Sequence, residues 1–150
     1  MVLNIVIGFI IPWILMIILY FRDKKVLLII APFQSAIAYT INMIGFYYGF
    51  WDLYPFGNKE IVHVLFDIGI YPMLSAYMIY YIHHKNINPF SVIFFFTLLT
   101  TCIEGAGVSI GKVVYGNGWN IGGTFISYLI PYILNYGYYL YLKKLGVFEN

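Results

Sequence analysis

Charged residues are scarce in this chain, and their scarcity excludes most classes of soluble protein. Only 9% of the 150 residues are Asp, Glu, Lys or Arg, whereas a soluble domain averages about 25%. Hydrophobic residues make up 62% of the sequence, and the mean hydropathy is +0.84. The net charge of +2 is too small and too dispersed to indicate nucleic-acid binding. This composition predicts an integral membrane protein.

Cysteine, arginine and the common catalytic motifs are also missing or nearly so. Cys102 is the single cysteine, so no intramolecular disulfide can form. Arg22, the single arginine, lies between apolar segments, so no arginine clamp for lipid phosphates is expected within them. The chain contains no His-Glu-x-x-His or Walker sequence. These absences argue against the enzymes that such motifs mark, and no cofactor is expected.

Five apolar runs fill most of the chain, and most charges lie in the short gaps between them. A helix of about 20 residues, rising 1.5 Å per residue, matches the roughly 30 Å hydrocarbon core of a bilayer. The predicted spans are Val2–Phe21, Val26–Tyr47, Ile61–Ile82, Phe90–Tyr115 and Ile121–Leu142. The sequence therefore predicts an all-α fold, a polytopic transmembrane helical bundle that forms one domain over residues 1–150.

The gaps carry unequal positive charge, which predicts an orientation in the cell membrane. Because basic loops resist translocation, the more basic side is expected in the cytoplasm. Alternate gaps on one side hold Arg22, Lys24, Lys25, Lys85, Lys143 and Lys144, whereas the other side holds Lys59 and Lys112. The N-terminus is then outside and the C-terminus inside.

Polar residues inside the runs recur at helical spacing, on one face of each of four runs. Such faces are expected to turn inward, because polar side chains are disfavoured against lipid. Counting the helical rise from each span end places several of them at a similar depth, in the outer third of the membrane. The pattern predicts an outward-facing polar pocket. Its expected ligand-binding residues are Asp67, Glu104, His63, Asn42, Ser127 and Trp119, the first two carrying the site.

Two intramembrane acids at one level need an explanation, since each costs at least about 2.5–3.5 kcal/mol on insertion scales. Asp67 and Glu104 could be accommodated by protonation of one acid, by a shared cation, or by pairing with His63 or Lys112. His63 and Asp67 at i, i+4, with Glu104 nearby, are also weak candidates for a divalent metal site. The structural alternative is that both carboxylates only stabilise the packing of the helices.

Glycine and proline predict irregularities within the helices. Pro72 cannot donate to the carbonyl of Ile68, which leaves a free acceptor that could face the pocket. Gly45 and Gly49 are four residues apart, and so are Gly107 and Gly111. This spacing permits close contact between helices. Close packing of the second and fourth spans is therefore expected, and the glycines of the fourth span make a bend plausible.

Short motifs around these residues resemble a family of small, functionally uncharacterised membrane proteins found in bacilli and clostridia. The matching elements are the Trp51 loop, the segment Asp67-Ile-Gly-Ile-Tyr-Pro72, the Glu104 helix, and Trp119 before the last span. The resemblance covers nearly the whole length. It implies a multi-spanning bundle in the cytoplasmic membrane and implies no known activity.

Three functions remain open from the residues. The favoured one is binding of a small polar ligand or cation in the pocket, as an accessory or sensing subunit. The second is a structural or accessory subunit with packing carboxylates. The third is an intramembrane acid/base enzyme, which one histidine and two carboxylates permit but which lacks an evident nucleophile. The expected partners are membrane lipids and either further copies of this chain or another membrane subunit, with no nucleic acid.

Overall fold

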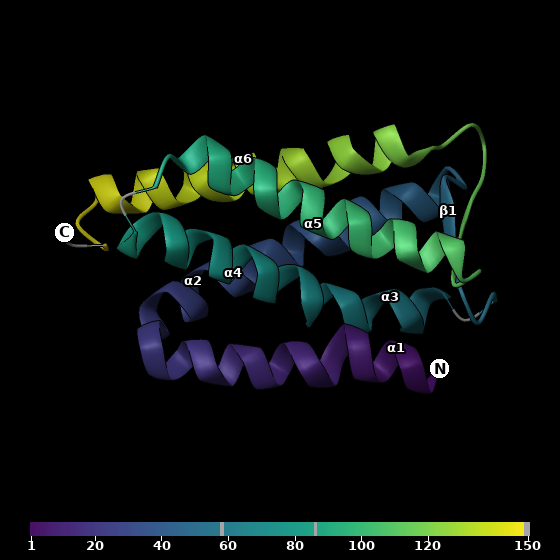
Figure 1. Ribbon diagram of the computed structural model, residues 1–150, viewed down its shortest axis with the longest axis horizontal. Coiled ribbons are helices and arrows are strands. Elements are labelled where there is room, and N and C mark those ends of the chain that lie inside the picture. The colour runs from purple at the N-terminus through teal and green to yellow at the C-terminus, as the bar shows by residue number, and fades with distance from the viewer. Residues whose placement is uncertain (58, 86, 149–150) are drawn as a thin grey trace.

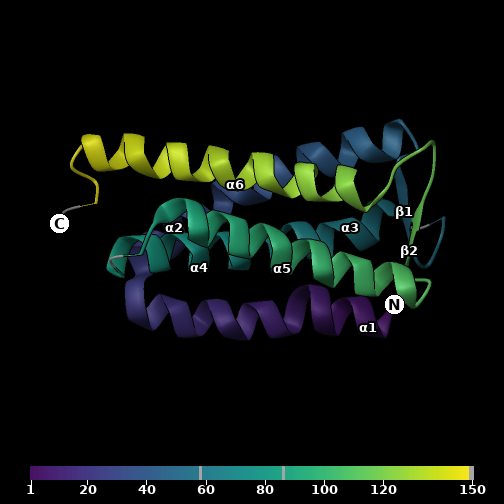
Figure 2. The ribbon, with the colours of Figure 1, turned by 45° about the horizontal axis from the view of Figure 1, so that its top comes forward.

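The computed structural model describes residues 1–57, 59–85 and 87–148, most of them in helices that run along one long axis (Figures 1 and 2). In chain order the helices are α1 (Val2–Ile5), the π-helical segment η1 (Val6–Ile10), α2 (Ile11–Tyr47), α3 (Lys59–Asp67), α4 (Ile70–His84), α5 (Pro89–Ser109) and α6 (Ile121–Lys144). Two short strands, β1 (Trp51–Leu53) and β2 (Val113–Tyr115), pair at one end. The all-α class is thus confirmed apart from this small sheet.

The first 46 residues of helix, Val2–Tyr47, turn back on themselves at Asp23. The backbone there leaves the helical region, with φ −155° and ψ 87°. The Asp23 Oδ1 atom accepts a hydrogen bond from the backbone N–H of Val26 at 2.9 Å, which caps the helix that follows. Figure 1 shows the chain running away from its N-terminus, reversing, and returning as the second half of α2. This turn coincides with the boundary predicted between the first two apolar runs.

The third predicted span is interrupted at Gly69, between α3 and α4. A Cβ atom at Gly69 would lie only 1.9 Å from the carbonyl oxygen of Gly8, so a glycine is required for this close approach. Pro72 leaves the Ile68 carbonyl without a helical donor, as expected from the sequence. That carbonyl accepts a hydrogen bond from Trp13 Nε1 at 3.1 Å, so the idea that it faces the polar pocket was wrong.

The fourth predicted span was too long by half a dozen residues, because α5 ends at Ser109. Gly111 adopts a left-handed conformation, φ +68°, which reverses the chain. The following segment, Val113–Tyr115, forms β2 and pairs antiparallel with Trp51–Leu53. Its β-branched and aromatic residues suit a strand as well as they suit an apolar span, so hydropathy alone did not separate the two.

The predicted glycine contact between the second and fourth spans is also wrong. The helices α2 and α5, whose residues are all described, do not pack against each other. Gly45 instead makes room for the Trp51 ring, and Gly107 faces Val113. Because glycine leaves this space, β1 packs against α2 and β2 packs against α5. The sheet therefore covers one end of the bundle.

The bundle buries polar side chains beside a hydrophobic core, and its outer surface is largely apolar. Within the part of the chain that the structure describes, three helical stretches are long and apolar enough to cross a membrane: Val2–Tyr47, Ile61–His84 and Pro89–Ser109. The 24 residues of α6 have sufficient length, but tyrosine, glycine and asparagine dilute its hydropathy. Fully or nearly fully buried polar side chains include those of Gln34, Ser75, Thr97, Thr100, Thr124 and Asn135, while large apolar side chains such as Phe94, Phe95, Ile130, Ile133 and Leu134 are exposed. Such a surface is typical of a protein that contacts lipid.

Candidate functional site

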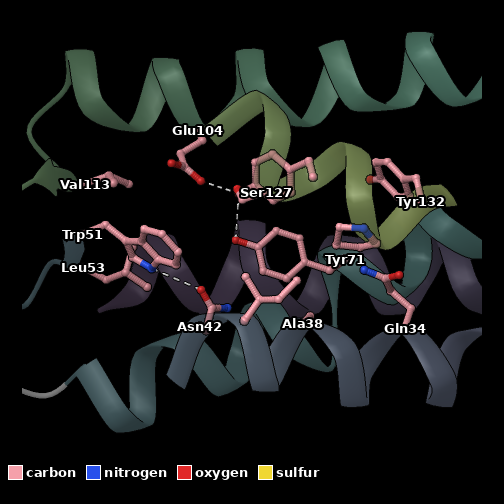
Figure 3. A pocket seen from close by; sticks show the side chains of 13 residues that line it. Gln34, Ala38, Asn42, Trp51, Leu53, Tyr71, Glu104, Val113, Ser127 and Tyr132 are labelled. Carbon is pink, nitrogen blue, oxygen red and sulfur yellow. Dashed lines mark hydrogen bonds between the residues drawn. The ribbon is translucent and has the colours of Figure 1, made fainter. Parts of the chain in front are cut away.

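A small polar pocket lies between α2, α4, α5 and α6, beneath β1 (Figure 3). Its volume of about 30 Å³ gives room for one or two water molecules. The residues that line it are Gln34, Ala38, Ile41, Asn42, Trp51, Leu53, Tyr71, Glu104, Val113, Ser127, Tyr128, Pro131 and Tyr132. Among the described residues that line it, Glu104 carries the only carboxyl group, and hydroxyl, amide and indole groups supply the remaining polar side-chain atoms.

Three hydroxyl groups surround the Glu104 carboxylate. Its Oε1 atom lies 2.8 Å from the Tyr115 hydroxyl and 2.9 Å from the Thr124 hydroxyl, and its Oε2 atom accepts from Tyr128. The Thr124 hydroxyl also lies 2.8 Å from the Tyr115 oxygen, so its one proton can go to either neighbour. Glu104, Tyr115, Thr124 and Tyr128 are called the Glu104 cluster below. Donors on both oxygens match the acceptor-only chemistry of an ionised carboxylate.

Local structure brings this cluster together from three elements. The reversal at Gly111 carries Tyr115 back along α5 to the level of Glu104. Asn120 then caps α6 by accepting from the N–H groups of Gly122 and Gly123 at 2.9 and 3.2 Å, which starts the helix one turn before Thr124. Burial raises the pKa of the Tyr115 phenol to about 12, so the phenol keeps its proton at neutral pH and can donate.

The second carboxylate, Asp67, forms a separate chain of hydrogen bonds. Its Oδ2 atom lies 2.6 Å from His63 Nδ1, and its Oδ1 atom accepts from Asn42 Nδ2 at 2.6 Å. Asn42 in turn accepts from Trp51 Nε1 at 3.2 Å. His63, Asp67, Asn42 and Trp51 are called the Asp67 cluster below. His63 and Asp67 are each only 1% exposed, and of the cluster only Asn42 and Trp51 reach the pocket.

Aromatic side chains connect the two clusters at the sheet end. The rings of Trp51 and Trp119 lie 4.9 Å apart, and Trp119 stacks on Phe50 at 4.7 Å. Trp119 Nε1 donates to the Thr124 hydroxyl at 3.0 Å, so each indole is hydrogen-bonded to a different cluster. Within the pocket, the Tyr71 hydroxyl lies 3.2 Å from that of Tyr128.

Three of the six residues predicted for the pocket line it: Asn42, Glu104 and Ser127. Asp67 and His63 are not part of the lining, because Asn42 lies between Asp67 and the pocket. The two acids that the sequence placed in one site therefore belong to two sites, and each has its own set of hydrogen-bond partners.

Trp119 and Lys112 make contacts outside the pocket. Trp119 is outside the pocket lining and is held by Thr124. Lys112 does not pair with Asp67 or Glu104; its ammonium lies 3.7 Å from the centroid of the Tyr54 ring, a cation–π contact. Asp67 is paired with His63, which was one of the alternatives left open.

The weak metal candidate made of His63, Asp67 and Glu104 is not supported. Among residues 1–57, 59–85 and 87–148, that set does not come within range of a shared ion. A different group, Asp23, His83 and His84, does.

Sequence reasoning missed the tyrosines of the site. In an uninterrupted helix Tyr71 would follow Asp67 by one turn, and Tyr128 follows Thr124 by one turn, so both fall on the polar faces that the sequence identified. Tyrosine is also common at membrane interfaces, so a tyrosine in an apolar run does not by itself indicate a site. Helical register could have identified Tyr71 and Tyr128, but not Tyr115, which reaches the site from a strand.

No family model matches the chain, and neither a curated protein nor a solved structure matches it. What the protein does must therefore follow from its own geometry. Three features of the structure bear on function: the apolar helices, the small pocket at Glu104, and the placement of the titratable side chains.

Proposed function

We propose that the chain is a multi-pass protein of the cell membrane with five spans, its N-terminus outside and its C-terminus inside. The turn at Asp23 divides Val2–Tyr47 into two segments, each of which is long enough to span, and α6 supplies a fifth. The turn and the ends of α4 and α6 all lie at the end opposite the sheet (Figures 1 and 2). Most of the basic residues flank these three places, which supports a cytoplasmic location for that end.

The function that the geometry supports best is binding of one small cation at Glu104. The observation that carries this proposal is a pocket of about 30 Å³ with a single carboxylate in its lining. Sites for organic ligands usually measure about 300 Å³ or more, ten times this volume. An ion that has shed its water, or one or two water molecules, is what fits.

A monovalent ion such as Na⁺ matches the charge of the site. One carboxylate balances one positive charge, whereas a divalent ion would leave an unbalanced charge in a poorly hydrated interior. The other polar atoms that can approach an ion are hydroxyl and amide oxygens, from residues such as Ser127, Tyr128 and Gln34. Oxygen donors of this kind suit hard cations.

The test is ion-dependent stability and direct ion binding in mild detergent. Wild-type protein should melt at a higher temperature when NaCl replaces choline chloride at constant ionic strength, and it should bind radiolabelled Na⁺ saturably. At Na⁺ concentrations near 100 times Kd, the stabilisation should be about 2.7 kcal/mol. Glu104→Gln should lose both effects.

Asp52→Asn is the matched control, because Asp52 lies in β1 but outside the pocket lining. This variant should keep the Na⁺ dependence of the wild type. A wild-type protein that binds neither Na⁺, Li⁺ nor K⁺ would contradict the proposal.

The structural alternative rests on a specific observation as well. The Glu104 carboxylate already has hydroxyl partners on both oxygens, which is what a packing role requires. On that alternative Glu104→Gln lowers the melting temperature by the same amount in NaCl and in choline chloride. An acid/base enzyme has less support. Glu104 also lines a larger apolar groove of about 300 Å³, but its carboxylate is already bound by three hydroxyl groups.

Membrane lipids are the partner that the surface supports. A groove of about 300 Å³ runs along α5 beside the N-terminal helix and α4. Apolar side chains such as those of Ile7, Phe66 and Ile103 make up most of its lining, which suits an acyl chain. Association with further copies or with another membrane subunit stays a prediction from the sequence.

A further inference from the structure

A second cluster of titratable side chains lies at the end of the bundle opposite the sheet, away from Glu104. Asp23, His83 and His84 each offer one ligand atom, and these atoms all lie within 4.8 Å of one another. The Asp23 Oδ2 atom is 2.8 Å from His84 Nε2. Neither the pocket nor the proposed cation site uses any of these residues.

The turn in α2 fixes the position of the carboxylate. Asp23 Oδ1 caps the returning helix at the N–H of Val26, which leaves Oδ2 directed at His84. The nearby cation Lys25 donates to the carbonyl of Val147 at 2.8 Å and does not pair with this carboxylate. One oxygen of Asp23 is therefore structural, and the other is available to a ligand.

The two imidazoles are placed by the last turn of α4, which ends at His84. His83 Nδ1 lies 3.0 Å from the hydroxyl of Tyr139 on α6, and its ring packs against Phe148. A partner on Nδ1 leaves Nε2 as the nitrogen that can bind an ion, and it also fixes the orientation of the ring. Hydrogen bonds of this kind, to the far nitrogen of a histidine, accompany metal ligation in most sites.

We propose that Asp23, His83 and His84 form a site for a divalent first-row metal ion of the Zn²⁺ type. Two imidazole nitrogens and one carboxylate oxygen are a ligand set that Zn²⁺ accepts, with solvent in the fourth position. Imidazole ligands favour such ions over Na⁺, Mg²⁺ or Ca²⁺. The His84 side chain is 41% exposed, so an ion can enter from solvent. This site is independent of the proposed function at Glu104.

A bound ion would join the turn of α2 to the end of α4. Asp23 and His84 are 61 residues apart in the sequence, and the ion pair between them joins the two segments. An exposed ion pair of this kind contributes little to stability. A metal bound by both helices would hold this end of the bundle closed, so its binding should raise the melting temperature.

The experiment is isothermal titration of ZnCl₂ into tag-free, full-length protein in detergent, after removal of trace metals. One Zn²⁺ should bind per chain. Asp23→Asn and His84→Gln should each weaken binding by at least about tenfold, because each removes one of three ligands. Tyr139→Phe should weaken it by about tenfold, through the loss of the hydrogen bond that orients His83.

The controls separate ligation from folding. Asn caps a helix as well as Asp does, so Asp23→Asn should keep the metal-free melting temperature of the wild type. Asp52→Asn and Glu104→Gln, which change carboxylates elsewhere, should bind Zn²⁺ as the wild type does. The proposal is overturned if wild-type protein binds no stoichiometric Zn²⁺, or if Asp23→Asn and His84→Gln bind it with unchanged affinity.

Discussion

The two acids on the polar helix faces, Asp67 and Glu104, occupy environments that differ in kind. Asp67 is 1% exposed and is bound by an imidazole and an amide. Glu104 is partly exposed to the pocket and is bound by three hydroxyls. The sequence presents them as equivalent, since each is one carboxylate on the polar face of an apolar helix.

Access is what separates a structural acid from a site for a ligand. No ion can reach Asp67 without displacing Asn42 or His63, whereas Glu104 already lines a space of the right size. We therefore expect Asp67 to determine stability and Glu104 to determine ion dependence. The substitutions below test that division, from the largest expected effect to the smallest.

Asp67→Ala should destabilise the protein by about 3 kcal/mol, since it leaves two buried partners, His63 and Asn42, without their acceptor. The measurement is the free energy of unfolding in a detergent–denaturant titration. In the variant that remains folded, Na⁺ should still raise the free energy of unfolding as it does in the wild type. Loss of the Na⁺ effect with little loss of stability would reverse the roles assigned to the two acids.

Gly45→Ala should cost about 2 kcal/mol, because its Cβ atom would lie 2.0 Å from the Trp51 ring, and such overpacking strains the site. Moving Trp51 breaks its hydrogen bond to Asn42 and its contact with Trp119, so both clusters should be disturbed. Thermal unfolding and tryptophan fluorescence would report this.

Gly137→Ala is the matched control, since nothing lies within 4 Å of a Cβ atom at that position in α6. Alanine there should be neutral or stabilising by up to about 1 kcal/mol, given the low helix propensity of glycine. Equal losses in the two variants would show that the space at Gly45 has no special importance.

Tyr115→Phe should lower stability by only about 1 kcal/mol, the ordinary value of one hydrogen bond. It removes one donor to Glu104 and leaves Thr124 and Tyr128 in place. Na⁺ affinity, measured by radiolabelled ion binding, should change severalfold without being abolished. Complete loss of binding would mean that Tyr115 itself contacts the ion.

Much of the fold was predictable because helix length and hydropathy are local properties. The turn at Asp23 follows from an Arg-Asp-Lys-Lys segment between two apolar runs, and the capping role of an aspartate there is a familiar pattern. The inward-facing polar residues followed from helical periodicity. Asn42, Glu104 and Ser127 were brought to one pocket as that periodicity predicts.

Several of the errors concern places where the backbone conformation departs from the helix. Residues 113–115 were assigned to a span because Val and Tyr are apolar, yet Gly111 turns them into a strand that pairs with residues 51–53. The glycines assigned to helix contacts make room for Trp51 and Val113 instead. Periodicity describes the face of a helix, and it does not say which segment will cover that face.

The sequence by itself determined that this chain is helical and apolar, where its first helix reverses, and which helix faces are polar, because each depends on neighbouring residues along the chain. Only the tertiary structure decided that Asp67 and Glu104 belong to different clusters, and that Asp23 meets His83 and His84. Those relations depend on contacts between segments far apart in the sequence, and on volumes of a few tens of Å³. Packing sets both, and no local pattern encodes them.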